Sequence, residues 1–125
     1  MACVLVLTGD LLFGSQVQGA LKLAGQEVEL VGDEARLRER LIAFAGDARP
    51  AADVLVVDLT DAELDGAGVL ASLKRAGELG ATRTLAFYSH VDSAARERAE
   101  AVGFDIVVAR SRMAREGPAL VSGLL

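Results

Sequence analysis

The sequence predicts an α/β fold with a five-stranded parallel doubly wound sheet and helices on both faces. Short β-branched runs alternate with segments of helical period along the chain. Runs such as residues 3–8 are apolar throughout, which is typical of strands covered on both faces, whereas residues 27–31, EVELV, alternate. Hydrophobic residues make up 52% and charged residues 25% of the chain, a balance typical of globular proteins. We therefore predict a single domain over residues 1–125.

Five runs have the composition expected of strands. Each is four to eight residues long and rich in Val, Leu, Ile or Thr, and turn residues separate them. Their alternation with helical segments favours parallel pairing. The predicted strands cover residues 3–8, 27–31, 53–58, 82–89 and 105–110.

The segments between and after these runs have helical spacing. In the second helix Leu37, Leu41 and Phe44 fall on one face. Gly25 follows the first helix as its expected C-cap, and Asp92 precedes the fourth as its expected N-cap. The predicted helices cover 10–25, 33–46, 66–80, 92–103 and a short final segment starting near Pro118.

The charge pattern argues against nucleic-acid binding. The formal net charge is −5, whereas nucleic-acid sites gather Lys and Arg. Arg36, Arg38 and Arg40 lie close together but alternate with Glu34 and Glu39, which indicates a solvated helix face.

The same sequence predicts a soluble, cytoplasmic protein without a membrane segment. No apolar run approaches membrane-spanning length, and the first ten residues are too short and too lightly flanked for a signal peptide. The one cysteine, Cys3, has no internal disulfide partner, which favours a reducing compartment. We expect it to be a small buried residue and not a reactive thiol.

Polar residues follow four of the predicted strands. In a doubly wound sheet, ligands bind beyond the carboxyl ends of the strands. That rule selects Thr8–Asp10, Asp58 with its loop, Tyr88–His90 and Ala109–Ser111. These four segments are the candidate functional site.

The third strand and its loop resemble the receiver domain of bacterial two-component response regulators. Receivers have a phosphate-accepting Asp at the end of this strand, usually a Pro four residues later, and an Asp-Gly or similar pair seven and eight residues later. Those places hold Asp58, Ala62, Asp65 and Gly66. The resemblance covers essentially the whole chain and implies a flavodoxin-like, receiver-like fold.

The resemblance implies a phosphorylation site, with departures. It makes Asp58 the candidate phosphoacceptor, Ser89 the hydroxyl of the fourth strand, and Arg110 the replacement for the lysine of the fifth. Receivers hold magnesium with an acid pair at the first strand end, where this chain has Thr8 and Gly9. Asp10 comes one residue late.

These departures predict an atypical receiver, or pseudo-receiver. Asp10 and Asp58 are expected to hold Mg²⁺ only weakly, and phosphorylation of Asp58 is expected to be impaired or lost. The aromatic residue usual in the fifth strand is also absent. Without phosphorylation, Asp58 is expected at a solvated strand end, paired with Arg110 or capping a nearby amide.

The expected function is therefore signalling through protein–protein interaction and not catalysis. The resemblance implies a stand-alone domain whose partner is a histidine kinase or a downstream effector. The last segment, "MAREGPALVSGLL", is apolar for a chain end. It is read either as a terminal helix on the sheet or, since receivers often pair through their fourth and fifth helices, as a homodimer contact.

An alternative is a small flavodoxin-like nucleotide- or ligand-binding module or enzyme. It would use the crevice near Gly9, Asp10, Ser89 and His90. The stretch "GDLLFGS" has the glycine spacing of a phosphate-binding loop but lacks its lysine. His90 has no second histidine to form a metal site, and either acid–base chemistry or loop packing fits its position.

Overall fold

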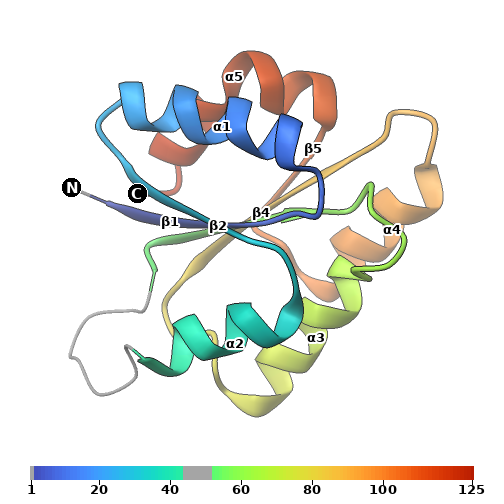
Figure 1. Cartoon of the computed structure of the whole chain (residues 1–125). Helices are drawn as coiled ribbons and strands as arrows, with labels where there is room; N and C mark the ends of the chain where they lie inside the picture. Colours follow the sequence, from blue (N-terminus) through green and yellow to red (C-terminus); the bar gives the residue numbers. More distant parts are fainter. Residues whose placement is uncertain (1, 44–51) are drawn as a thin grey trace.

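The computed structural model describes residues 2–43 and 52–125, which form one parallel sheet and its helices (Figure 1). The strand order is β2-β1-β3-β4-β5. The strands are β1 Cys3–Leu7, β2 Glu27–Val31, β3 Val54–Asp58, β4 Arg83–Tyr88 and β5 Ile106–Ala109. The helices are α1 Leu11–Leu23, α2 Glu34–Ala43, α3 Gly66–Ala76, α4 Ser93–Val102 and α5 Arg110–Ser122.

Helices cover both faces of the sheet, as the apolar strands predict. Helices α1 and α5 lie on one face, and α2, α3 and α4 lie on the other (Figure 1). Along β1, Val4 and Val6 pack in the core beneath α1 and α5. Leu5 and Leu7 point the other way, into the core beneath α2, α3 and α4. Because successive side chains of a strand alternate between faces, a doubly covered strand has to be apolar at every position.

Several predictions about single elements are confirmed. Strand β2 covers the predicted residues 27–31. Asp92 caps α4, its Oδ1 accepting a hydrogen bond of 3.0 Å from the Ala95 N–H. The C-cap of α1 is Ala24 and not the expected Gly25, which follows it with a φ of 91°, a conformation that favours glycine. The end of the predicted helix 33–46, with Phe44, lies outside the described residues.

The predicted start of the last helix is wrong. Helix α5 begins at Arg110, and Pro118 lies inside it. Ala109 precedes the helix without a side-chain cap, so the sequence has no start signal there. Met113, Gly117 and Val121 form its buried face, which packs on α1 and the sheet. The apolar chain end therefore belongs to the core.

Two arginines of α2, Arg38 and Arg40, are paired with acids. Arg38 lies 2.6 Å from Glu78 of the segment after α3 and 3.2 Å from Glu34, measured between nitrogen and oxygen. Arg40 Nε lies 2.5 Å from an oxygen of Glu29 on β2. These ion pairs join α2 to its neighbours and balance the basic cluster of the sequence.

Cys3 lies at the amino end of β1, away from the strand ends that form the candidate site. Burial raises the pKa of its thiol, and the negative charges of Glu27, Asp53 and Glu29 raise it further. A raised pKa lowers the thiolate fraction, in keeping with an unreactive cysteine. Within residues 2–43 and 52–125, no helix has the length and apolarity needed to cross a membrane.

Candidate functional site

The carboxyl ends of β1, β3, β4 and β5 lie along one edge of the sheet. Leu7 of β1 is in register with Val57 of β3, so Thr8 and Asp58 leave the sheet side by side. Tyr88 of β4 is in register with Ala109 of β5, which places Ser89 beside Arg110. The four segments selected from the sequence therefore meet in space.

Asp58 is buried, and both oxygens of its carboxylate accept hydrogen bonds. The residue is only 1% exposed to solvent. Oδ2 accepts a 2.7 Å hydrogen bond from the hydroxyl of Thr8. Oδ1 accepts two from Thr60, at 2.7 Å from the N–H and 2.6 Å from the hydroxyl. The expectation of a solvated acid is wrong, whereas the expectation that Asp58 caps a nearby amide is confirmed.

Arg110 pairs with Asp10 and not with Asp58. Its Nη2 lies 2.9 Å from Oδ2 of Asp10. The other oxygen of Asp10 accepts from the Phe13 N–H at 3.0 Å and caps α1, which turns Oδ2 toward α5. The guanidinium also lies over the ring of Phe13, 4.2 Å from its centroid. The ion pair expected between strands three and five is replaced by one that joins the starts of α1 and α5.

Sequence reasoning missed two hydrogen-bond donors of the site. Thr60 stands two residues after Asp58, and an acid that accepts from the amide two residues on is the known Asx turn. The pattern Asp-x-Thr was thus a readable signal. Thr8 was noted only as a missing acid, yet it is 2% exposed and its oxygen also accepts from the Asp10 N–H at 3.0 Å.

Ser89 and Arg110 line an open depression of about 700 Å³. Asp58 is not among the lining residues; Thr60, which covers it, is. Ser89 is half-buried, and His90 beside it is exposed. The depression is lined by Phe13, Gln16, Thr60, Ser89, His90, Arg110, Ser111 and Ala114. The structure therefore brings Ser89 and Arg110 together and leaves Asp58 underneath.

The side chains at this edge do not fit a magnesium ion well. Asp10 is already opposed by a guanidinium, and Asp58 already accepts three hydrogen bonds. Magnesium demands near-octahedral oxygen ligands, and the donors already bonded to these two carboxylates compete with such an ion. In the described parts of the chain, no group of three His, Cys, Asp or Glu side chains is arranged to hold a metal.

The "GDLLFGS" stretch forms the start of a helix and not a phosphate-binding loop. Asp10 is the N-cap of α1, and Leu11 is its first residue. Gly14 is buried inside the helix, and a Cβ there would lie 2.9 Å from Cγ2 of Thr8. The glycine therefore serves the close packing of α1 on the end of β1.

The Asp-Gly pair after β3 also has a packing role. Asp65 takes the left-handed conformation, with a φ of 41°, and caps α3. A Cβ at Gly66 would lie 2.5 Å from Cγ1 of Val57 and 2.8 Å from Cδ2 of Leu59. Oδ1 of Asp65 lies 3.0 Å from a guanidinium nitrogen of Arg98 on α4. The pair starts α3 tightly against β3.

Comparison with known proteins shows what this fold resembles. No family model matches the sequence, and no curated protein matches it. The chemotaxis response regulator CheY4 of Vibrio cholerae is 21% identical over 100% of this chain and 99% of its own, with a TM-score of 0.78. The receiver domain of TorR, from the TMAO respiratory system, is 16% identical over 99% and 96%, with a TM-score of 0.80. The Mn²⁺-bound response regulator Rcp1 is 18% identical over 99% and 91%, with a TM-score of 0.74. The chain has the flavodoxin-like fold of response-regulator receiver domains.

Proposed function

We propose that this chain is an atypical receiver-like signalling domain that works by binding other proteins, with phosphorylation of Asp58 impaired or lost. The observation that supports this most is the closure of Asp58 beneath Thr8 and Thr60. The proposal assigns no catalytic turnover to the chain.

The closure works against the chemistry of a phosphoacceptor. Attack requires a carboxylate oxygen in line with the phosphorus and free to form a bond. Both oxygens of Asp58 are engaged, and hydrogen bonds to them stabilise the charge that the attack would use. Arg110, which would meet the phosphoryl oxygens, is held by Asp10. Any magnesium bound at Asp10 and Asp58 would therefore be weakly held.

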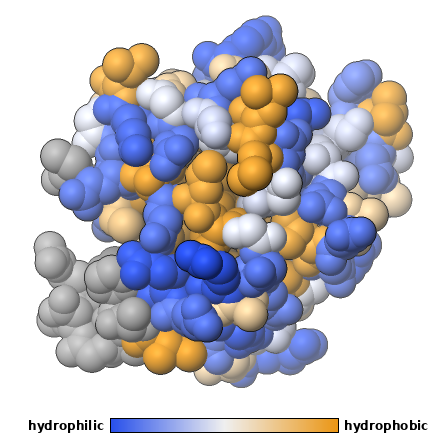
Figure 2. All heavy atoms as spheres, in the orientation of Figure 1, coloured by the Kyte–Doolittle hydropathy of each residue, from blue (hydrophilic) through white to orange (hydrophobic). Residues whose placement is uncertain are grey.

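Exposed apolar side chains support an interaction role. Leu11 and Leu12 at the start of α1 are 73% and 74% exposed, and Leu23 at its end is 93% exposed. Figure 2 shows apolar surface among hydrophilic atoms on the face that α1 presents. Contiguous apolar patches on the surface of a protein often mark sites of protein–protein contact. We assign the partner to the class of histidine kinases or downstream effectors, in the cytoplasm, with a homodimer through α4 and α5 as a further mode.

Intact mass spectrometry tests the proposal. The protein is incubated with magnesium and acetyl phosphate, with the Asp58→Asn variant as the matched control. We expect no added phosphoryl group on the native chain. A gain of one phosphoryl group that is absent from Asp58→Asn would restore a conventional receiver and overturn the proposal.

A second variant shows whether the missing acid and lysine are the reason that Asp58 is not phosphorylated. Thr8→Asp with Arg110→Lys returns an acid to the end of β1 and a lysine to the start of α5. If the missing groups limit the reaction, this variant gains phosphate under conditions in which the native chain does not. The open depression favours a second candidate, a ligand-binding module.

A further inference from the structure

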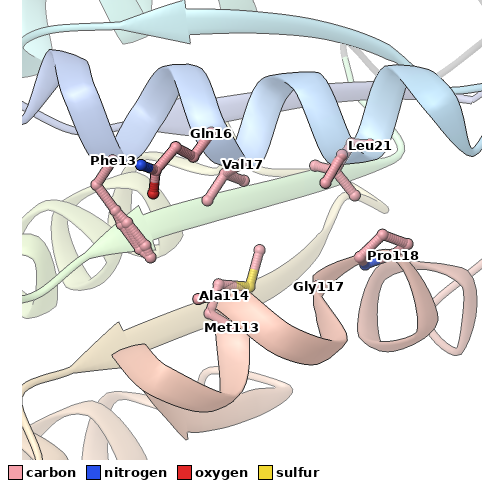
Figure 3. A pocket seen from close by; sticks show the side chains of 9 residues that line it. Phe13, Gln16, Val17, Leu21, Met113, Ala114, Gly117 and Pro118 are labelled. Carbon is pink, nitrogen blue, oxygen red and sulfur yellow. The ribbon is translucent and has the colours of Figure 1, made fainter.

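Two hollows lie away from the strand-end depression, and they differ in size and access. The notch between α1 and α5 has a volume of about 40 Å³. Val17, Leu21 and Met113, which face one another across it in Figure 3, are buried, so this notch belongs to the packing of the core. The hollow on the other face of the sheet has a volume of about 300 Å³ and is open to solvent.

The larger hollow lies between the loop that follows β3 and the first turns of α4 (Figure 1). Ten residues line it: six are leucine, alanine or glycine, three are aspartate and one is arginine. The hollow therefore combines an apolar surface with an excess of negative charge.

The floor of the hollow consists of small apolar residues. Gly66 and Ala67 at the start of α3 are buried, and Leu59 and Ala95 are half-buried. Liquid water would fill a volume of this size with about ten molecules, so one long side chain has room there. A long basic side chain lays its carbon stem on apolar surface while its charged end stays among polar groups.

The rim of the hollow is acidic. Asp61 is half-buried, and Asp65 and Asp92 are exposed. Oδ1 of Asp61 accepts from the Glu63 N–H, and Oδ1 of Asp92 accepts from the Ala95 N–H. Within residues 2–43 and 52–125, Oδ2 of Asp61 and Oδ2 of Asp92 accept no hydrogen bond. Each of these two carboxylates thus keeps one oxygen for a cation.

Arg98 shows which cation this rim accepts. One of its guanidinium nitrogens lies 3.0 Å from Oδ1 of Asp65. The two side chains are 63% and 57% exposed, and an ion pair of that exposure is weak and readily exchanged. Three carboxylates face this single guanidinium, so the hollow is complementary to a further positive charge.

We propose that the hollow receives an arginine side chain of a protein partner, with the guanidinium at Asp61 and Asp92 and the carbon stem on Ala67 and Ala95. The inference rests on the interaction role in the proposed function and names a contact surface for it. Arginine fits better than lysine because its planar guanidinium forks onto carboxylates. The mass measurement at Asp58 and the binding measurement below report on different groups, so each can fail without the other.

Titration with a short peptide tests the hollow. The probe is acetyl-Gly-Ala-Arg-Ala-Gly-amide, and ¹H–¹⁵N spectra of the labelled protein follow the amide signals of Gly66 and Ala95. We expect saturable shifts of both signals that weaken as salt is added. The matched peptide has citrulline in place of arginine, which keeps the size and removes the charge. It is expected to bind at least about fivefold more weakly.

Four variants assign the binding to the hollow. Asp92→Asn removes one rim charge while asparagine still caps α4, and we expect it to weaken binding about threefold. Its control, Glu97→Gln, removes an exposed acid of the same helix that does not line the hollow. Ala95→Leu fills the floor and should abolish binding, and Ala101→Leu, at an exposed position of α4, is its control.

Arg98→Gln provides the reverse test. It removes the guanidinium that occupies Asp65, so the peptide should bind about threefold more tightly. The control is Arg96→Gln, which removes an arginine of the same helix that pairs with Glu100 and does not line the hollow.

The outcomes that overturn the proposal are distinct. The arginine peptide may leave the Gly66 and Ala95 signals in place, or the citrulline peptide bind equally well. Asp92→Asn and Ala95→Leu may bind as their controls do. Shifts of the same signals as strong with spermidine would give the hollow to a free polyamine, and shifts on concentrating the protein alone would give it to a second copy of this chain.

Discussion

The two halves of the carboxyl edge of the sheet differ in access to solvent. At the ends of β1 and β3, Thr8 and Asp58 are 2% and 1% exposed and bonded to each other. At the ends of β4 and β5, Ser89 and Arg110 line an open depression. Asp58, the candidate phosphoacceptor, lies in the closed half, whereas Ser89 and Arg110 lie in the open half.

The difference teaches that the two halves of this edge contribute differently to stability. A buried, hydrogen-bonded carboxylate contributes to stability, because removing it leaves its donors unpaired. An exposed ion pair such as that of Arg110 with Asp10 contributes little to stability. We therefore expect mutations in the closed half to change the free energy of unfolding more than mutations in the open half do.

The largest expected effect is that of Asp58→Ala. The variant leaves the buried hydroxyl of Thr8 and the amide of Thr60 without an acceptor, so the free energy of unfolding should fall by about 3 kcal/mol. Urea denaturation measures this. Glu63→Ala, at an exposed position of the following loop, is the control and should change stability by less than about 0.5 kcal/mol. A loss below about 1 kcal/mol for Asp58→Ala would show that the closed half is not closed in solution.

A smaller loss is expected for Gly14→Ala. The new methyl group would lie 2.9 Å from Cγ2 of Thr8, so the start of α1 must move away from β1, at a net cost of about 2 kcal/mol. Gly19→Ala is the matched control in the same helix, because nothing lies within 4 Å of its Cβ. It should raise stability by about 0.5 to 1 kcal/mol through helix propensity. Equal effects of the two substitutions would contradict the close contact.

The open half is expected to respond weakly to Arg110→Gln. The Arg110 and Asp10 side chains are 46% and 39% exposed, and ion pairs of that exposure contribute less than about 1 kcal/mol. Thermal unfolding at low and high salt measures the change, and the small loss should shrink as salt screens the pair. A loss as large as that of Asp58→Ala would make Arg110 a structural residue of the closed half.

The smallest expected effect is that of magnesium. Millimolar magnesium should leave the melting temperature of the native chain almost unchanged, because Asp10 and Asp58 are occupied by protein donors. Arg110→Gln frees Asp10 and should make the protein more responsive to magnesium. A clear rise in the melting temperature of the native chain would show that the ion displaces Arg110.

The fold could be predicted from the sequence because a central strand such as β3 is apolar along its buried length. Residues 54–57 are apolar and all are buried, as a doubly covered strand requires. The start of α5 could not be predicted, since Ala109 makes no cap and Pro118 imitates a first helical residue. A proline inside a helix is tolerated here, within a helix held by its buried face.

The sequence predicted where the candidate site lies but not which of its side chains pair with each other. The strand ends selected Asp58, Ser89 and Arg110, and the structure gathers them at one edge. Which acid meets Arg110 depends on the direction in which Asp10 points, and that follows from its capping of α1. Spacing along the chain does not show in which direction a side chain points. The Asp10–Arg110 pair could therefore be found only from the structure.

The contact between Thr8 and Gly14 has a consequence for the history of this sequence. A methyl group of Thr8 occupies the space that a side chain at position 14 would need. The two positions therefore form one packing unit and cannot change size independently. Among relatives, threonine at position 8 should accompany glycine at position 14, whereas a relative with a side chain lacking that methyl group at position 8 should tolerate alanine at 14.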